Sequence, residues 1–149
     1  MRLVIQRVKE ASVCVDGTIV GKVGQGVLVL LGVHKNDLPA HTVWLVQKLI
    51  HLRIFSDEQG KMNRSLLEIG GEALIVSQFT LYANCNEGRR PGFDEAARGE
   101  LAKALYEKFV EELKREIKTV QTGVFGALME VSLVNDGPIT LIVDYPEKI

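Results

Sequence analysis

The fold is decided at the start of the chain, in residues 2–33, RLVIQRVKEASVCVDGTIVGKVGQGVLVLLGV. Apolar residues alternate with polar ones or run together, which predicts strands at residues 2–8, 12–16, 18–23 and 27–33. Asp16-Gly17 supplies a tight turn, because both residue types tolerate positive φ. Gly24 and Gly26 lead into a strand rather than a helix, so they are interpreted as a hairpin turn and not as a phosphate-binding loop. The segment predicts a four-stranded antiparallel opening.

Two helices are predicted in the middle of the chain. Asp37 can cap the first helix, with Pro39 in its first turn. An apolar stripe runs along this helix at Val43, Trp44, Val46, Leu49, Ile50 and Leu52. Asp94 can cap a second, longer helix that extends to about residue 117. Its apolar residues recur every four positions, at Ala97, Leu101, Leu105, Phe109, Leu113 and Ile117.

The remaining segments are predicted to be strands, at residues 52–60 with a turn, 73–79, 119–122, 127–134 and 139–145. Between the last two lies NDGPIT, residues 135–140, where Asn, Asp and Gly suit a hairpin turn and Pro138 adds nothing that such a turn needs. Sheet at both ends of the chain and helices between them indicate an α+β fold. We expect a single-domain layered β/β/α sandwich over residues 1–149, with largely antiparallel sheets and two main helices.

Charge and composition limit how this protein can bind nucleic acid and where it is found. The formal net charge is -1, from 18 Lys and Arg against 19 Asp and Glu, so a nucleic acid would have to be bound by a local basic patch. The N-terminus has no apolar stretch of signal-peptide length, which predicts a cytoplasmic protein. Cys14 and Cys85 have no C-x-x-C spacing and are expected to be reduced thiols without a functional role.

The common catalytic and metal-binding patterns are missing from the sequence. His34, His41 and His51 lack the spacing of zinc ligands and are interpreted as structural or surface residues. Ser77 lacks the G-x-S-x-G context of a serine nucleophile. We therefore expect no metal and no cofactor.

Polar residues gather where the buried strand at residues 73–79 ends. Ser77, Gln78 and Thr80 surround Phe79, and two interpretations remain open. The three side chains can simply satisfy hydrogen bonds of the following loop. Alternatively they form the floor of a pocket, in which backbone N–H groups bind a developing oxyanion and a glutamine amide orients an ester. Thr80 would be a nucleophile only beside a base, and the local sequence supplies none.

Other candidate residues are also ambiguous. Four basic residues lie in predicted loops: Lys61, Arg64, Arg89 and Arg90. They are either solvated or contact phosphate, for which the planar guanidinium of arginine is well suited. Met129 shares a strand face with Val131 and Leu133, which favours core packing, although Met129 and Phe125 can also line a pocket.

Five segments together resemble one known family. They are MRLVIQRV (1–8), LRIFSDEQGKMNRSL (52–66), VSQFTLYA (76–83), RRPGF (89–93) and TGVFGALMEVSLVNDGPIT (122–140). Their order and spacing are similar to those of the D-aminoacyl-tRNA deacylases, first called D-tyrosyl-tRNA deacylases, over essentially the whole chain. The departures are mild, because Ile139 and Gly92 stand where the family commonly has Val and Ser.

The resemblance implies a fold like that of this family and assigns site residues. Ser77, Gln78, Phe79 and Thr80 match the motif at the catalytic pocket, and Phe125, Met129, Asn135 and Arg7 match positions near the pocket. Gly137-Pro138 matches a Gly-Pro pair with a cis peptide bond, which crosses a homodimer interface into the partner's pocket. There its carbonyls hold the α-amino group of the substrate and leave no room for an L side chain.

The implied reaction is hydrolysis of the ester bond of D-aminoacyl-tRNA, and of glycyl-tRNA if glycine is accepted. The aminoacylated 3′ end of tRNA is then the partner, and the ribose 2′-hydroxyl helps to activate water. Two alternatives stay open, a non-catalytic RNA-binding module of the same fold and a hydrolase of another acyl ester or amide.

Overall fold

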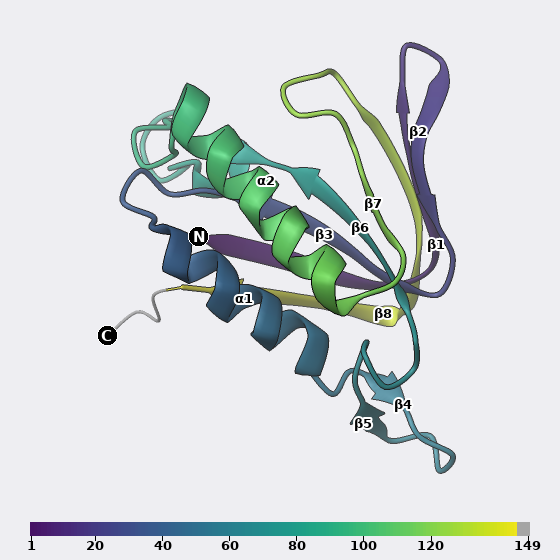
Figure 1. The fold of residues 1–149 in the computed structure, drawn as a ribbon. Coiled ribbons are helices and arrows are strands. Elements are labelled where there is room, and N and C mark those ends of the chain that lie inside the picture. Colours follow the sequence, from purple (N-terminus) through teal and green to yellow (C-terminus); the bar gives the residue numbers. More distant parts are fainter. Residues whose placement is uncertain (146–149) are drawn as a thin grey trace.

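The computed structural model describes residues 1–145, and the last four residues of the expected domain lie outside the described part. Figure 1 shows two helices side by side over one face of a central sheet. The strands are β1 (Arg2–Val15), β2 (Thr18–Val23), β3 (Gly26–Gly32), β4 (Phe55–Ser56), β5 (Met62–Arg64), β6 (Glu72–Ser77), β7 (Val120–Thr122) and β8 (Glu130–Asp144). The helices are α1 (Pro39–His51), the short 3-10 helix η1 (Phe79–Tyr82) and α2 (Gly99–Glu116).

The main sheet has the order β2-β1-β3-β6-β7, and β8 also pairs with β1. The two halves of β1 have different neighbours, because residues 2–8 pair with β3 and residues 11–15 pair with β2. Strand β8 accompanies β1 along both halves. The two long strands therefore run from the central sheet into a second β layer, which stands on the right of Figure 1.

Two apolar clusters fill the spaces between the layers. The larger cluster packs α1 and α2 on the sheet and includes Leu3, Ile5, Val29, Leu31, Leu45, Leu49, Ile75, Leu105 and Phe109. The smaller cluster lies between the two β layers and includes Val8, Val13, Val23, Leu28, Leu74 and Val76. This arrangement confirms the predicted α+β fold with β/β/α layering and two main helices. Among residues 1–145, no helix has the length and apolar content of a membrane span.

Strand β2 closes over the second core because a glycine faces β7. A Cβ atom at Gly21 would lie 2.4 Å from the carbonyl oxygen of Thr122. No real Cβ atom makes such a contact, so only glycine permits this close approach of the two backbones.

The predicted four-stranded opening is wrong in two details. Residues 2–15 form one strand, because Lys9 and Glu10 continue it through irregular pairing where it passes between the layers. The predicted hairpin at Gly24 and Gly26 is also wrong, since β2 and β3 pair with different halves of β1 and not with each other.

The β3-β6-β7 part of the main sheet is parallel, whereas the pairings of β1 are antiparallel. Strand β6 lies parallel to both β3 and β7. The apolar run Ala73-Leu74-Ile75-Val76 is buried on both faces, as predicted, which is typical of a parallel strand covered by two layers. The strand ends at Ser77 rather than at Phe79, because Phe79 begins η1.

Both helices begin later than predicted. Lys35 N–H donates to Glu95 O and Ala97 N–H donates to Val33 O, at 3.0 and 2.9 Å. This backbone pairing holds the segment before Gly99 extended, so Asp94 does not cap α2. Asp37 does not cap α1 either, because its carboxylate accepts hydrogen bonds from other groups, described below.

The buried face of α2 also differs from the predicted stripe, since Leu101 is 40% exposed. The face that packs on the core consists of Ala102, Leu105, Tyr106, Phe109, Val110 and Leu113. A strict four-residue spacing drifts around a helix of 3.6 residues per turn, so Leu101 has rotated away from the face that carries Leu113.

The segment NDGPIT is not a hairpin. Residues 130–135 and 140–144 pair with the same strand, β1, in one direction, so the chain continues as β8. Between Asn135 and Thr140, four residues bulge out opposite Arg7. The Gly137–Pro138 peptide bond in this bulge is cis.

Candidate active site

A cavity of about 490 Å³ lies at the carboxyl end of β6. Its lining comes from four separate segments and includes Leu31, Val33, Val76, Ser77, Gln78, Phe79, Ala97, Arg98, Ala102, Phe125, Met129 and Val131. Five residues proposed from the sequence meet here: Ser77, Gln78, Phe79, Phe125 and Met129. The volume is in the range typical of pockets for small ligands.

The end of β6 positions the polar part of this pocket. Gln78 N–H donates to Leu31 O at 2.8 Å, which ties the strand end to β3 before the chain turns into η1. The first N–H groups of a helix have no partner within it, and in η1 these belong to Phe79 and Thr80. The Gln78 side-chain amide donates to the hydroxyl of Thr80. Thr80 itself is exposed and stands beside the cavity rather than in its lining.

Aromatic packing supports the opposite wall. The rings of Tyr106 and Phe125 lie 5.6 Å apart, centre to centre. The Tyr106 hydroxyl donates to Ile75 O at 3.0 Å, so α2 and β6 are joined behind the pocket. Burial raises the pKa of Tyr106 to about 12, which keeps its hydroxyl protonated as a donor. Met129 packs against the second core from the same side, together with Val131.

Among the described residues that line the cavity, Arg98 alone is ionisable. None of the described residues in the lining is Asp, Glu, His or Cys, so they offer no obvious general base. Within residues 1–145, no three His, Cys, Asp or Glu side chains are grouped so as to hold a metal ion. The thiols of Cys14 and Cys85 are free. These walls can orient a substrate and donate hydrogen bonds to it.

Four other residues proposed from the sequence lie together at a different place, around the bulge in β8: Arg7, Asn135, Gly137 and Pro138. Arg7 Nε donates to Asp136 O at 2.9 Å, and Arg7 NH1 donates to Ile54 O at 2.8 Å. Asn135 Oδ1 accepts from Ile139 N–H, and Asn135 Nδ2 donates to Thr140 Oγ1, both at 2.9 Å. These bonds hold the bulge, but the bulge does not line the cavity of its own chain.

Comparisons with known proteins agree on one family. The sequence model of the family described as D-Tyr-tRNA(Tyr) deacylase matches residues 4–144. The chain belongs to this deacylase family. A D-aminoacyl-tRNA deacylase from Thermomicrobium roseum is 58% identical over 147 residues, which are 99% of this chain and 96% of that protein. Another from Thermosipho africanus is 59% identical over 144 residues, 97% of each chain.

Solved structures agree with the deacylase fold. The c-Myc DNA unwinding element binding protein superposes with a TM-score of 0.93 at 38% identity, covering 98% of this chain and 99% of that one. A probable eukaryotic D-amino acid tRNA deacylase gives a TM-score of 0.83 at 20% identity, covering 95% and 97%, which speaks for the fold alone. The family resemblance drawn from the five sequence segments is thereby confirmed.

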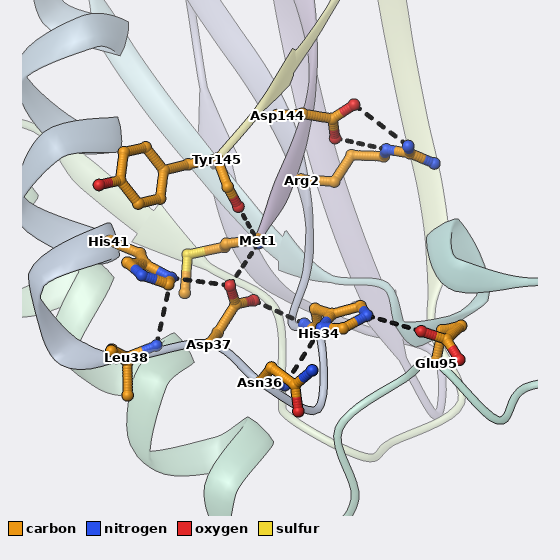
Figure 2. Close-up of polar contacts among 10 residues, drawn as sticks. All are labelled: Met1, Arg2, His34, Asn36, Asp37, Leu38, His41, Glu95, Asp144 and Tyr145. Carbon is orange, nitrogen blue, oxygen red and sulfur yellow. Dashed lines mark hydrogen bonds and ion pairs between the residues drawn. The ribbon is translucent and has the colours of Figure 1, made fainter. Parts of the chain in front are cut away.

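The deacylase chain has a second cavity, of about 440 Å³, beside its N-terminus. As Figure 2 shows, the Met1 amino group donates to Asp37 Oδ1 and to Tyr145 O, both at 2.6 Å. His41 Nδ1 lies 2.9 Å from the same Asp37 oxygen, and His34 N–H donates to Asp37 Oδ2. Burial lowers the pKa of the Met1 amino group, although the Asp37 carboxylate acts in the opposite direction. We refer to these groups as the N-terminal cluster.

The ionisable groups of the second cavity are already paired with one another. Arg2 donates to both carboxylate oxygens of Asp144, at 2.7 and 3.1 Å. His34 Nε2 lies 2.8 Å from Glu95, whose pKa is lowered by Lys35 and, to a smaller extent, by His34. We therefore place the candidate active site in the cavity at β6. Sequence reasoning missed the positions of Asp37 in the N-terminal cluster and of Arg98 in the cavity lining, because both were placed at or inside the start of a predicted helix.

Proposed function

We propose that this chain hydrolyses the ester bond of D-aminoacyl-tRNA, releasing a D-amino acid and tRNA, and spares L-aminoacyl-tRNA. One observation carries the proposal: in a member of the deacylase family, the Ser-Gln-Phe-Thr segment turns at a cavity of small-ligand size. Ser77, Gln78 and Phe79 line this cavity. Such an enzyme would act in translation quality control, where chiral proofreading takes place in the cytoplasm.

The chemistry would depend on orientation and on hydrogen-bond donors. Water adds to the ester carbonyl carbon, the bond to the ribose oxygen breaks, and that oxygen leaves with a proton. Backbone N–H groups of Phe79 and Thr80 would stabilise the developing oxyanion, and the Gln78 amide would orient the ester. Because the lining residues within 1–145 include no general base, the neighbouring ribose 2′-hydroxyl would help to activate the water. Thr80 then has no role as a covalent nucleophile.

Chiral selection would come from a second copy of the chain. The Gly137-Pro138 bulge lies opposite Arg7, in the middle of β1, and its residues are not among those that line the pocket of the same chain. Gly137 and Pro138 are exposed, and so is Ile142 farther along β8. A two-fold axis across this face would bring each bulge to the partner's pocket. Carbonyl groups there would hold the α-amino group and reject an L side chain.

The decisive experiment measures deacylation of D-Tyr-tRNA and L-Tyr-tRNA by the purified protein in parallel, with chelator present. Rapid loss of the D ester alone is expected. Glycyl-tRNA should also be cleaved, because glycine has no side chain to reject. Similar rates for the D and L esters would contradict chiral selection by this site.

The same assay separates the two alternatives. Binding of tRNA without turnover would favour a non-catalytic RNA-binding module of the same fold. Hydrolysis of small esters that does not depend on RNA would favour a hydrolase with other substrates.

A further inference from the structure

An aromatic pair lies at the mouth of the candidate active site. Phe79 lines the cavity, yet 55% of its surface is exposed. Its ring meets that of Phe93 edge to face, with the ring centres 5.1 Å apart. Exposed aromatic rings are the surfaces on which unpaired nucleobases stack.

Arginines flank this pair on two sides. Arg98 lines the cavity directly before α2. Arg89 and Arg90 lie in a loop whose base is closed beside Phe93, since the backbones of Asn84 and Gly92 exchange hydrogen bonds of 2.8 and 2.9 Å. All three arginines are exposed. Within residues 1–145, none of them has a carboxylate at ion-pair distance.

The nearby carboxylate of Glu95 is paired with residues other than the three arginines. Glu95 is held by Lys35 at 2.8 Å and by His34 at 2.8 Å, and these contacts lower its pKa. Its charge is thus largely neutralised by neighbours other than the three arginines. The guanidinium groups remain free to bind phosphate oxygens, which the planar fork of arginine matches.

We propose that Phe79, Phe93, Arg98 and the Arg89-Arg90 loop form a binding surface for single-stranded RNA. It would hold the unpaired nucleotides that precede the terminal adenosine of the substrate tRNA. A base stacks on the aromatic pair, and the arginines contact the phosphates on either side. This inference rests on the proposed function and adds to it how the enzyme recognises RNA beyond the reacting ester. Because the net charge of the protein is -1, RNA has to be bound by a local basic surface of this kind and not by the charge of the whole protein.

The test compares two substrates that share the same ester. One is D-Tyr-tRNA, and the other is D-tyrosyl-adenosine, which carries neither phosphates nor further bases. The variants are Arg98→Gln, Arg90→Gln, Phe93→Leu and Phe93→Trp. Arg115→Gln is the matched control, because Arg115 is an exposed arginine at the far end of α2.

For the wild type, kcat/KM should be much higher on tRNA than on the adenosine ester. Phe93→Leu should lower the ratio of these two values by at least about fivefold, the equivalent of one lost stacking contact. Phe93→Trp should retain the ratio, because it preserves an aromatic face. Each arginine variant should raise KM on tRNA and reduce the salt dependence of log KM by about 0.7. Arg115→Gln should change neither quantity.

Different outcomes overturn different statements. If the wild type hydrolyses neither ester, the proposed function fails. If the wild type hydrolyses both esters equally well, or if the variants lower both activities in proportion, the proposed activity is supported but the proposed RNA-binding surface is refuted. Thermal unfolding of each variant shows whether the protein is still folded, and Phe93→Trp keeps the test valid should Phe93→Leu be unstable.

Discussion

The two cavities of this protein have similar volumes, about 440 and 490 Å³, but their polar groups behave in opposite ways. The short helix η1 separates them, since its Tyr82 lines the first and its Phe79 lines the second. In the N-terminal cluster, charged groups are satisfied by one another, and this pairing stabilises the fold. In the β6 cavity, Arg98 has no ion-pair partner among residues 1–145, and the first N–H groups of η1 have none within that helix, which leaves them available to a substrate. Substitutions should therefore cost stability in one cavity and activity in the other.

The largest effect is expected for Asp37→Asn in the N-terminal cluster. The Met1 amino group and Asp37 are both buried, so the substitution removes the counter-charge of the amino group. Both Asp37 oxygens accept hydrogen bonds, so the amide NH2 of the introduced asparagine would face a donor at either position. The free energy of unfolding should fall by about 3–5 kcal/mol. For a chain of this length, Tm should fall by roughly 6–20 °C. Urea and thermal unfolding measure both quantities.

Asp144→Asn is the matched control for Asp37→Asn. Asp144 pairs with Arg2 in the same cavity, but both side chains are about a quarter exposed. The loss should be about 1 kcal/mol or less, because solvent screens such a pair. Equal losses for the two variants would mean that burial of the Met1–Asp37 pair is not what stabilises this region.

The next largest effect is expected in the other cavity, for Gln78→Ala. Its amide lines the pocket and donates to Thr80. On D-Tyr-tRNA, kcat/KM should fall about 10- to 100-fold, equivalent to about 1.4–2.7 kcal/mol of transition-state stabilisation. Unfolding free energy should stay within about 0.5 kcal/mol of the wild type. Gln47→Ala, on the exposed side of α1, is the control and should change neither kcat/KM nor the free energy of unfolding. A large loss of stability for Gln78→Ala would contradict the proposed difference between the two cavities.

A smaller effect is expected for Tyr106→Phe, behind the pocket. The hydroxyl donates to Ile75 O, which also accepts from Gly123 N–H at 3.2 Å, so the substitution should cost about 1 kcal/mol. Burial raises the pKa of Tyr106 from 10.0 to about 12. The unfolded chain therefore loses this proton first, and folding stability should fall as pH rises from 10 to 12.

Urea unfolding at several pH values checks this sign. Tyr106→Phe should show a shallower decline above pH 10 than the wild type. The decline that remains is assigned to Tyr82, whose pKa is also raised by burial. An unchanged slope would show that the Tyr106 hydroxyl is not buried as the structure has it.

The smallest effect is expected for Thr80→Val. Thr80 is exposed beside the cavity, and its hydroxyl accepts a hydrogen bond from Gln78. Without a base beside it, kcat should change by less than about fivefold, or about 1 kcal/mol. Mass spectrometry of the wild type during turnover should detect no acyl group on Thr80. Loss of most activity together with a trapped acyl-enzyme would reverse this assignment.

Much of the candidate site could be predicted from the sequence, some residues from the local pattern and others only from the family resemblance. Local pattern placed Ser77 at the end of a buried strand, because an apolar run followed by polar residues marks a strand leaving the core. The relevance of Phe125 and Met129 came only from the family resemblance, since strand alternation equally suited core packing. Arg98 had no local signal, because the periodic pattern of α2 extended over it.

The sequence by itself determined the classes of element and the family. Alternation, apolar runs and a four-residue helical period predict strands and helices through local geometry, and the five long segments identify the deacylases. Only the tertiary structure decided which strands pair, that β8 continues through Gly137-Pro138, and that residues 94–98 pair with residues 33–35, directly after β3, instead of joining α2. The physical reason is that these choices depend on partners far away in the chain. A turn signal or a cap is worth about 1 kcal/mol, and a buried backbone ladder readily outweighs it.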